Sequence, residues 1–119
     1  MVDTRSWLKR AGEVAQNYRI NRRMLGAMRR YQKRGQLNLM NPKEAEWDII
    51  AEVTAVDKAF VEIAADSEAL SFANLLYRKR GHPSVSGCAR ALLIPSAQAY
   101  KYNKAFLRFV AKHLDNEGE

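Results

Sequence analysis

Three prolines, Pro42, Pro83 and Pro95, limit where helices can run in this 119-residue chain, because proline interrupts a helix beyond its first turn. Between the prolines, apolar residues recur three and four positions apart, which is the spacing of an amphipathic α-helix. The sequence holds no run of polar residues alternating with β-branched residues, the pattern that would predict strands. We therefore expect an all-α protein, a helical bundle with a carboxy-terminal helix-turn-helix and a basic amino-terminal helical segment.

Capping and turn residues give the expected bounds of the helices. The first helical stretch is either one long helix or two helices joined near Asn21. Asn41 is expected to cap the second helix, and Asp66 or Ser67 the third, which Gly81 would end. The polar tail 115–119 is expected to fray. The expected helices cover about 4–34, 42–65, 67–80, 84–92 and 95–113.

Charge is distributed unevenly along the chain. There are 20 Lys and Arg residues and 13 Asp and Glu residues, which gives a formal net charge of +7. Residues 1–40 hold ten basic and two acidic residues, whereas residues 41–80 hold five basic and eight acidic ones. We therefore separate a basic helical segment, 1–40, from a helical domain, 41–119. A basic surplus favours a polyanionic partner, and the basic segment is either a solvated helix surface or a source of sequence-independent phosphate contacts.

Several classes of function find no support in the sequence. A single cysteine, Cys88, cannot form an internal disulfide or a cysteine-based zinc site, and His82 and His113 make no metal-ligand pattern. No base is placed beside the cysteine for nucleophilic catalysis, so we expect no metal, no cofactor and no enzyme activity. No apolar run is long enough to span a bilayer, and MVDTRSWLKR lacks the apolar core of a signal peptide. We expect a cytoplasmic protein without membrane contact.

The most informative stretch lies at about 84–113 and begins SVSGCARALLIPSAQAYKYNKAFLRFVA. The stretch predicts a short capped helix, then the tight turn 93–95, then a longer helix. This is the order of a helix-turn-helix. Ala89 is the small residue where two such helices would cross. Leu92 and Ile94 would fill the space between them.

The last helix of this motif is expected to have one strongly basic face. If its apolar residues point inward, four basic residues spaced three, four and four apart form a stripe on the opposite face. The first turns of such a helix read base edges, and its later positive residues contact phosphates. Gln98 is the candidate for pairing with adenine, Lys101 for guanine, and Ala97 for the methyl group of thymine. The candidate DNA-binding residues are Ser96, Ala97, Gln98, Lys101, Lys104, Arg108, Lys112, Arg78, Lys79, Arg80 and Arg90.

These stretches resemble those of a known group of regulators. AVDKAFVEIAADSEALSFANLLYRKR resembles the paired helices that precede the motif in small phage-encoded transcriptional regulators of the RinA and ArpU type. VSGCARALLIPSAQAYKYNKAFLRFVAKHL resembles their terminal pattern, which is similar to region 4 of sigma-70-type factors. The resemblance covers about residues 55–114 and implies DNA binding near promoters of late or packaging-associated phage genes, in the cytoplasm of a bacterial host. Leu93 stands where glycine is usual in the turn, and Pro95 stands where a serine cap is usual.

The sequence therefore predicts a sequence-specific DNA-binding transcriptional regulator, a phage or prophage activator of late genes, that binds double-stranded DNA. RNA polymerase is a candidate partner, and the amino-terminal helices are a candidate homodimer interface with Met24, Leu25, Met28 and Tyr31 as its seam. Two alternatives stay open. One is a small terminase-like DNA-packaging subunit, and the other is a protein that binds RNA polymerase or another host protein through the acidic helix 44–68.

Overall fold

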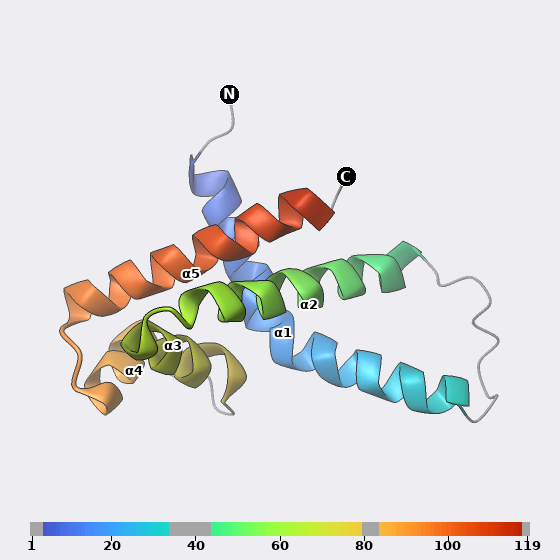
Figure 1. The fold of residues 1–119 in the computed structure, drawn as a ribbon, viewed down its shortest axis with the longest axis horizontal. Coiled ribbons are helices and arrows are strands. Elements are labelled where there is room, and N and C mark those ends of the chain that lie inside the picture. Colours follow the sequence, from blue (N-terminus) through green and yellow to red (C-terminus); the bar gives the residue numbers. More distant parts are fainter. Residues whose placement is uncertain (1–3, 34–43, 80–83, 118–119) are drawn as a thin grey trace.

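The computed structural model describes residues 4–33, 44–79 and 84–117, with side chains described for 7–27, 48–79 and 84–115, and every element in these ranges is helical (Figure 1). The prediction of an all-α fold is therefore confirmed. The elements are α1 (Thr4–Lys33), α2 (Glu44–Ile63), α3 (Ser67–Ala73), the π-helical turn η1 (Asn74–Arg78), α4 (Val85–Leu92) and α5 (Ser96–Glu117).

The helices form a bundle in which α5 lies along α2 with the opposite chain direction, and α1 crosses both (Figure 1). α3, η1 and α4 lie together near the end of the bundle where α2 finishes and α5 begins. α1 is one continuous helix rather than two helices joined near Asn21, although its axis changes direction along its length in Figure 1. This arrangement leaves one long side of α5 uncovered by the helices packed against it.

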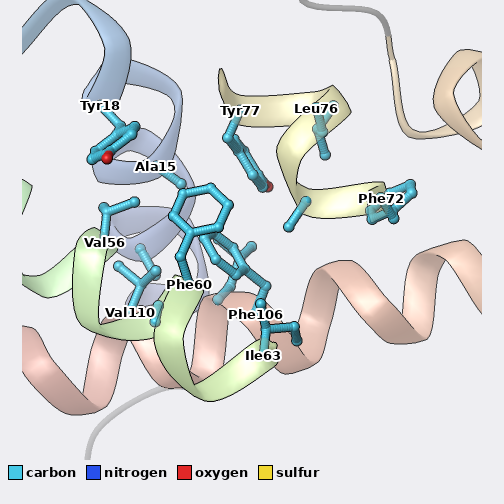
Figure 2. Packing of buried hydrophobic residues seen from close by; sticks show 14 of the residues in the cluster. Ala15, Tyr18, Val56, Phe60, Ile63, Phe72, Leu76, Tyr77, Phe106 and Val110 are labelled. Atoms are coloured by element: carbon cyan, nitrogen blue, oxygen red, sulfur yellow. The ribbon is translucent and has the colours of Figure 1, made fainter. Parts of the chain in front are cut away.

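One aromatic cluster joins the helices at the centre of the bundle (Figure 2). The ring of Phe106 on α5 lies 4.8 Å from that of Phe60 on α2 and 5.2 Å from that of Tyr77 on η1, measured between centroids. Tyr18 on α1 continues the cluster, with its ring centroid 5.7 Å from that of Phe60. These separations lie in the range where aromatic pairs attract beyond the burial of their area.

The amino-terminal half of α1 is part of this same core. Ala11, Val14, Ala15 and Tyr18 are buried against the other helices. Gly12, beside them, lies close to the side chain of Leu107 on α5, where a Cβ atom added to the glycine would meet Leu107 Cδ1 at 4.0 Å. The described part of the basic amino-terminal segment, helix α1, therefore packs through its apolar face as one element of the bundle.

The expected helix bounds hold where a local cap sets them. The Asp66 carboxylate accepts from the backbone N–H groups of Glu68 and Ala69 at 3.1 and 3.2 Å, so Asp66, rather than Ser67, caps the third helix. The Ser84 hydroxyl accepts from the N–H of Gly87 at 3.1 Å and caps α4. The predicted Asn41 cap lies outside the described residues, as do Gly81 and His82.

Two features of the helices differ from the expectation. α5 continues to Glu117 instead of ending near His113, because Leu114 is buried and holds the additional turn against the core. Residues 115–117, predicted from the sequence to belong to a frayed tail, are therefore part of α5. The third predicted helix changes to a π-helical turn, in which the N–H of Lys79 donates to the carbonyl oxygen of Asn74 at 3.1 Å.

Candidate nucleic-acid interface

α4 and α5 are joined by three residues, Leu93, Ile94 and Pro95. Leu93 has φ 57° and ψ 42°, the left-handed conformation. Its N–H donates to the carbonyl oxygen of Arg90 at 3.3 Å, and the N–H of Ile94 donates to that of Ala89 at 2.8 Å. These two hydrogen bonds make a Schellman motif, in which glycine usually occupies the left-handed position. The turn therefore closes with leucine at the position where glycine is usual.

Apolar side chains on both sides of this turn hold the two helices together. Ala89 and Ile94 are buried in the core, and Leu92 packs against it in part. Pro95 directly precedes α5, and its carbonyl oxygen accepts from the N–H of Ala99 at 3.0 Å. Because proline has no N–H to leave unpaired at a helix start, this position suits it.

The outer face of α5 carries exposed basic residues at helical spacing. Lys101, Lys104 and Arg108 are exposed, and we call these three residues the α5 basic stripe. Ser96 and Ala97, in the first turn of the same helix, are exposed as well. The opposite face of α5 is buried through Phe106 and other apolar residues, so the core fixes the direction in which the stripe points.

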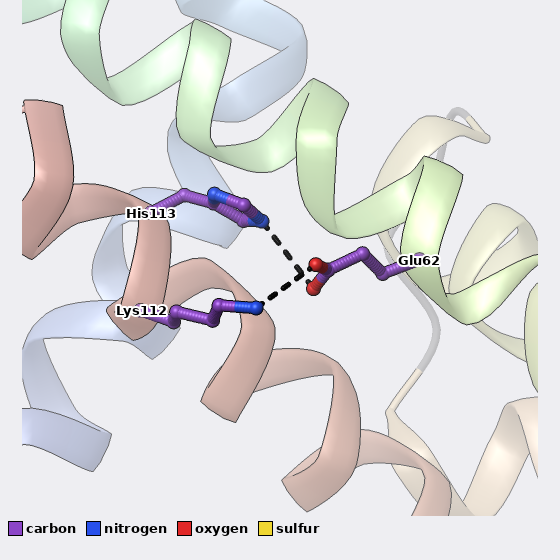
Figure 3. Close-up of polar contacts among 3 residues, drawn as sticks. All are labelled: Glu62, Lys112 and His113. Carbon is purple, nitrogen blue, oxygen red and sulfur yellow. Dashed lines mark hydrogen bonds and ion pairs between the residues drawn. The ribbon is translucent and has the colours of Figure 1, made fainter.

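Two of the candidate residues on α5 have partners inside the protein. Gln98 is half-buried, and its side chain hydrogen-bonds to the hydroxyl of Tyr102. Lys112 lies with its Nζ 3.1 Å from Oε1 of Glu62 on α2, and Nε2 of His113 lies 3.3 Å from Oε2 of the same carboxylate (Figure 3). The hydrogen bond from Lys112 holds the pKa of Glu62 below its usual value. Lys112 therefore ties α5 to α2 as well as facing solvent.

The basic residues outside α5 are placed differently. The guanidinium carbon of Arg78 lies 3.6 Å above the ring centroid of Phe60, and its Nη1 donates to Oδ1 of Asn74 at 2.9 Å. Arg78 thus stacks on α2, which is a stabilising arrangement for a guanidinium on an aromatic face. Lys79 and Arg90 are exposed. Arg80 lies outside the described residues.

One exposed residue of α5 is absent from the predicted set. Tyr100 is 55% exposed and lies three residues after Ala97 and four before Lys104, on the border of the outer face. The same helical spacing that indicated the lysines also indicates this tyrosine, but its apolar ring gave no reason to place it outside. A tyrosine here adds a hydroxyl donor and an aromatic face beside the stripe.

The predicted homodimer seam is described only in part. Met24 is exposed, whereas Leu25 packs partly against the core. The side chains of Met28 and Tyr31 lie outside the described residues. The dimer therefore stays a prediction.

Three further properties of the described part of the chain concern metal ligands, the cysteine and the apolar character of its helices. No group of three or more His, Cys, Asp or Glu side chains there is placed to hold a metal ion. Cys88 is buried, and burial raises the pKa of its thiol, which disfavours the reactive thiolate. No helix within the described ranges combines the length and apolar character needed to cross a membrane.

No protein family, curated protein or solved structure matches the chain.

Proposed function

We propose that this chain is a sequence-specific DNA-binding protein that regulates transcription, and that the first turns of α5 enter the major groove. The observation that carries the proposal is the α5 basic stripe, which follows an exposed helix start directly after a tight turn. An α-helix with its side chains is about 10–12 Å across, and the major groove is about 12 Å wide. A helix supported from one side by the core and basic on the other suits that groove.

Residues near the start of α5 are proposed to contact bases, and residues further along the helix to contact phosphates. Ala97 and Lys101 lie in the first two turns of the helix, where base edges are in reach. Arg108 follows Lys101 by seven residues, a rise of about 10 Å along the axis, and is proposed to contact phosphate. Because Gln98 and Lys112 already have partners within the protein, Lys101 is the strongest candidate for direct base contact.

The resemblance of residues 55–114 to small phage regulators supplies the proposed biological role. It makes a promoter-proximal site the expected target and activation of phage or prophage late genes the expected outcome, in the cytoplasm of a bacterial host. RNA polymerase is the candidate protein partner in this role.

Two single substitutions test the proposal. We expect Lys101→Ala to relax sequence preference by about 1–3 kcal/mol at one base position, because a base contact is lost. Arg108→Ala should weaken binding to all duplexes alike and reduce the salt dependence by about one phosphate contact. Fluorescence anisotropy with selected and random duplexes, at low and moderate salt, measures both effects.

Lys9→Ala is the matched control, because Lys9 is an exposed basic residue on α1. If both α5 variants bind selected and random duplexes as the parent does, α5 is not the reading helix. Unselective, salt-dependent binding by a ring-shaped oligomer would instead favour the DNA-packaging alternative. The absence of binding at either salt concentration would favour a protein-binding role.

A further inference from the structure

Three arginines on α1 surround a hollow in the protein surface. Arg19, Arg22 and Arg23, together with Gly26, line a space of about 380 Å³. Gly26 has no side chain, so it leaves open a part of the helix surface that another residue would cover. We call this space the arginine hollow. It lies on a different helix from the α5 basic stripe.

No described carboxylate forms a direct ion pair with the three arginines. Arg19 is half-buried, and its Nε is buried without a hydrogen-bond partner among the described residues. Because buried donors nearly always have acceptors, this N–H would gain one if the Arg19 side chain, which lines the hollow, turned toward a ligand oxygen there.

One of the three arginines is held in position by a neighbour. Nη1 of Arg22 donates to the hydroxyl of Tyr18 at 3.3 Å, and its guanidinium carbon lies 5.9 Å from the centroid of the Tyr18 ring. The Tyr18 hydroxyl donates in turn to Asp57, so this carboxylate reaches Arg22 only through the tyrosine. Fixing a long side chain before a ligand arrives reduces the entropy that binding must remove.

We infer that Arg19, Arg22 and Arg23 form a phosphate-binding site, and that its ligand is the phosphodiester backbone of DNA. Guanidinium groups present planar pairs of N–H donors that match phosphate oxygens, and they stay charged at all physiological pH values. The choice of DNA as the source of the phosphate rests on the proposed function. The phosphate site itself rests on the arginine hollow alone.

Side-chain NMR tests the site without DNA. Arginine Nε–H signals are recorded while inorganic phosphate is added, against sodium chloride at matched ionic strength. We expect a saturable shift of the Arg19 Nε–H signal with phosphate and none with chloride. Arg19→Lys, which keeps the charge but loses the Nε–H and the fork, should weaken phosphate binding, whereas Lys9→Gln on the same helix should not. The absence of a saturable shift overturns the phosphate site, whatever the α5 variants do.

A second arm tests DNA as the source of the phosphate. Arg23→Gln should weaken binding to selected and random duplexes by the same factor, and should reduce the slope of log affinity against log salt by about 0.9 for one lost contact. Lys9→Gln should leave that slope unchanged. An unchanged slope in Arg23→Gln, with phosphate binding intact in the parent, overturns the assignment to DNA. Saturable phosphate binding by a parent chain that binds no duplex overturns both that assignment and the proposed function.

Discussion

At the scale of single residues, Leu93 has the conformation least suited to its chemistry. Among the described residues it is the one non-glycine residue with a positive φ, and its side chain is 92% exposed. The left-handed conformation costs an L-residue with a Cβ roughly 1–2 kcal/mol. Since the exposed side chain recovers little of this by burial, the turn is held by its two backbone hydrogen bonds and by Ile94 in the core.

Replacing Leu93 with glycine should therefore stabilise the protein. We expect Leu93→Gly to raise the free energy of unfolding by up to about 1 kcal/mol, because the relief of strain exceeds the backbone entropy that glycine loses on folding. Leu93→Ala keeps the strained φ and should change the stability by less than about 0.5 kcal/mol. Urea unfolding followed by far-UV circular dichroism measures both variants. A marked loss of stability in Leu93→Gly would show that the leucine side chain makes a stabilising contact.

At the scale of the elements, the predicted features that depend on neighbouring residues are the ones that hold. Asp66 caps α3 as its position in the sequence indicates, and α4 is a capped helix as expected, with Ser84 as the cap, because a cap needs only the next two or three residues. The last turn of α5 and the π-helical turn were not predicted. They depend on the burial of Leu114 and on the stacking of Tyr77 against Phe106, which are contacts made in the folded bundle.

In the candidate site too, features set by local spacing could be predicted, whereas contacts made in the folded bundle could not. Helical periodicity is enough to place Lys101 and Lys104 on the outer face of α5, where both are exposed. It cannot show that Lys112 pairs with Glu62, which lies 50 residues earlier in the chain. Periodicity does place Gln98 one turn before Tyr102, but it cannot show that their side chains hydrogen-bond, since that depends on rotamers.

The Asp66 cap gives a prediction at this scale. Asp66→Ala removes the acceptor for two backbone N–H groups at the start of α3 and should lower the free energy of unfolding by about 1 kcal/mol. Asp66→Asn keeps a side-chain oxygen in the same place and should retain most of the stability. Thermal and urea unfolding of the three proteins check this. Equal losses in both variants would show that the negative charge, rather than the cap, is what Asp66 contributes.

At the scale of the whole molecule, tyrosine hydroxyls connect helices that are far apart in the sequence. Each of three tyrosines donates a hydrogen bond to a side chain on another helix. The pairs are Tyr18 of α1 with Asp57 of α2, Tyr77 of η1 with Asn103 of α5, and Tyr102 of α5 with Glu68 of α3. The first bond joins α1 to α2, and the other two join α5 to η1 and α3. Because unfolding breaks all three bonds, the ionisation of these tyrosines should affect the stability of the bundle.

The pKa of each of these tyrosines is raised above the ordinary value of 10.0. Burial is the main cause for Tyr18 and Tyr77, and the hydrogen bond to Glu68 is the main cause for Tyr102. Unfolded tyrosines lose their protons near pH 10, whereas the folded ones keep theirs. The unfolded state therefore binds fewer protons there, and the free energy of unfolding must fall as pH rises above this value.

Tyr77 should account for a separable part of this fall in the free energy of unfolding at alkaline pH, because burial raises its pKa far above the usual value. For one such group the expected slope is about 1.4 kcal/mol per pH unit above pH 10. Tyr77→Phe should be less stable than the parent at neutral pH, because Asn103 loses its donor, yet should show a shallower decline at alkaline pH. Urea unfolding at a series of pH values tests this. Parallel alkaline declines in the two proteins would mean that the Tyr77 hydroxyl ionises alike in the folded and unfolded chains, which is incompatible with its burial against Phe106.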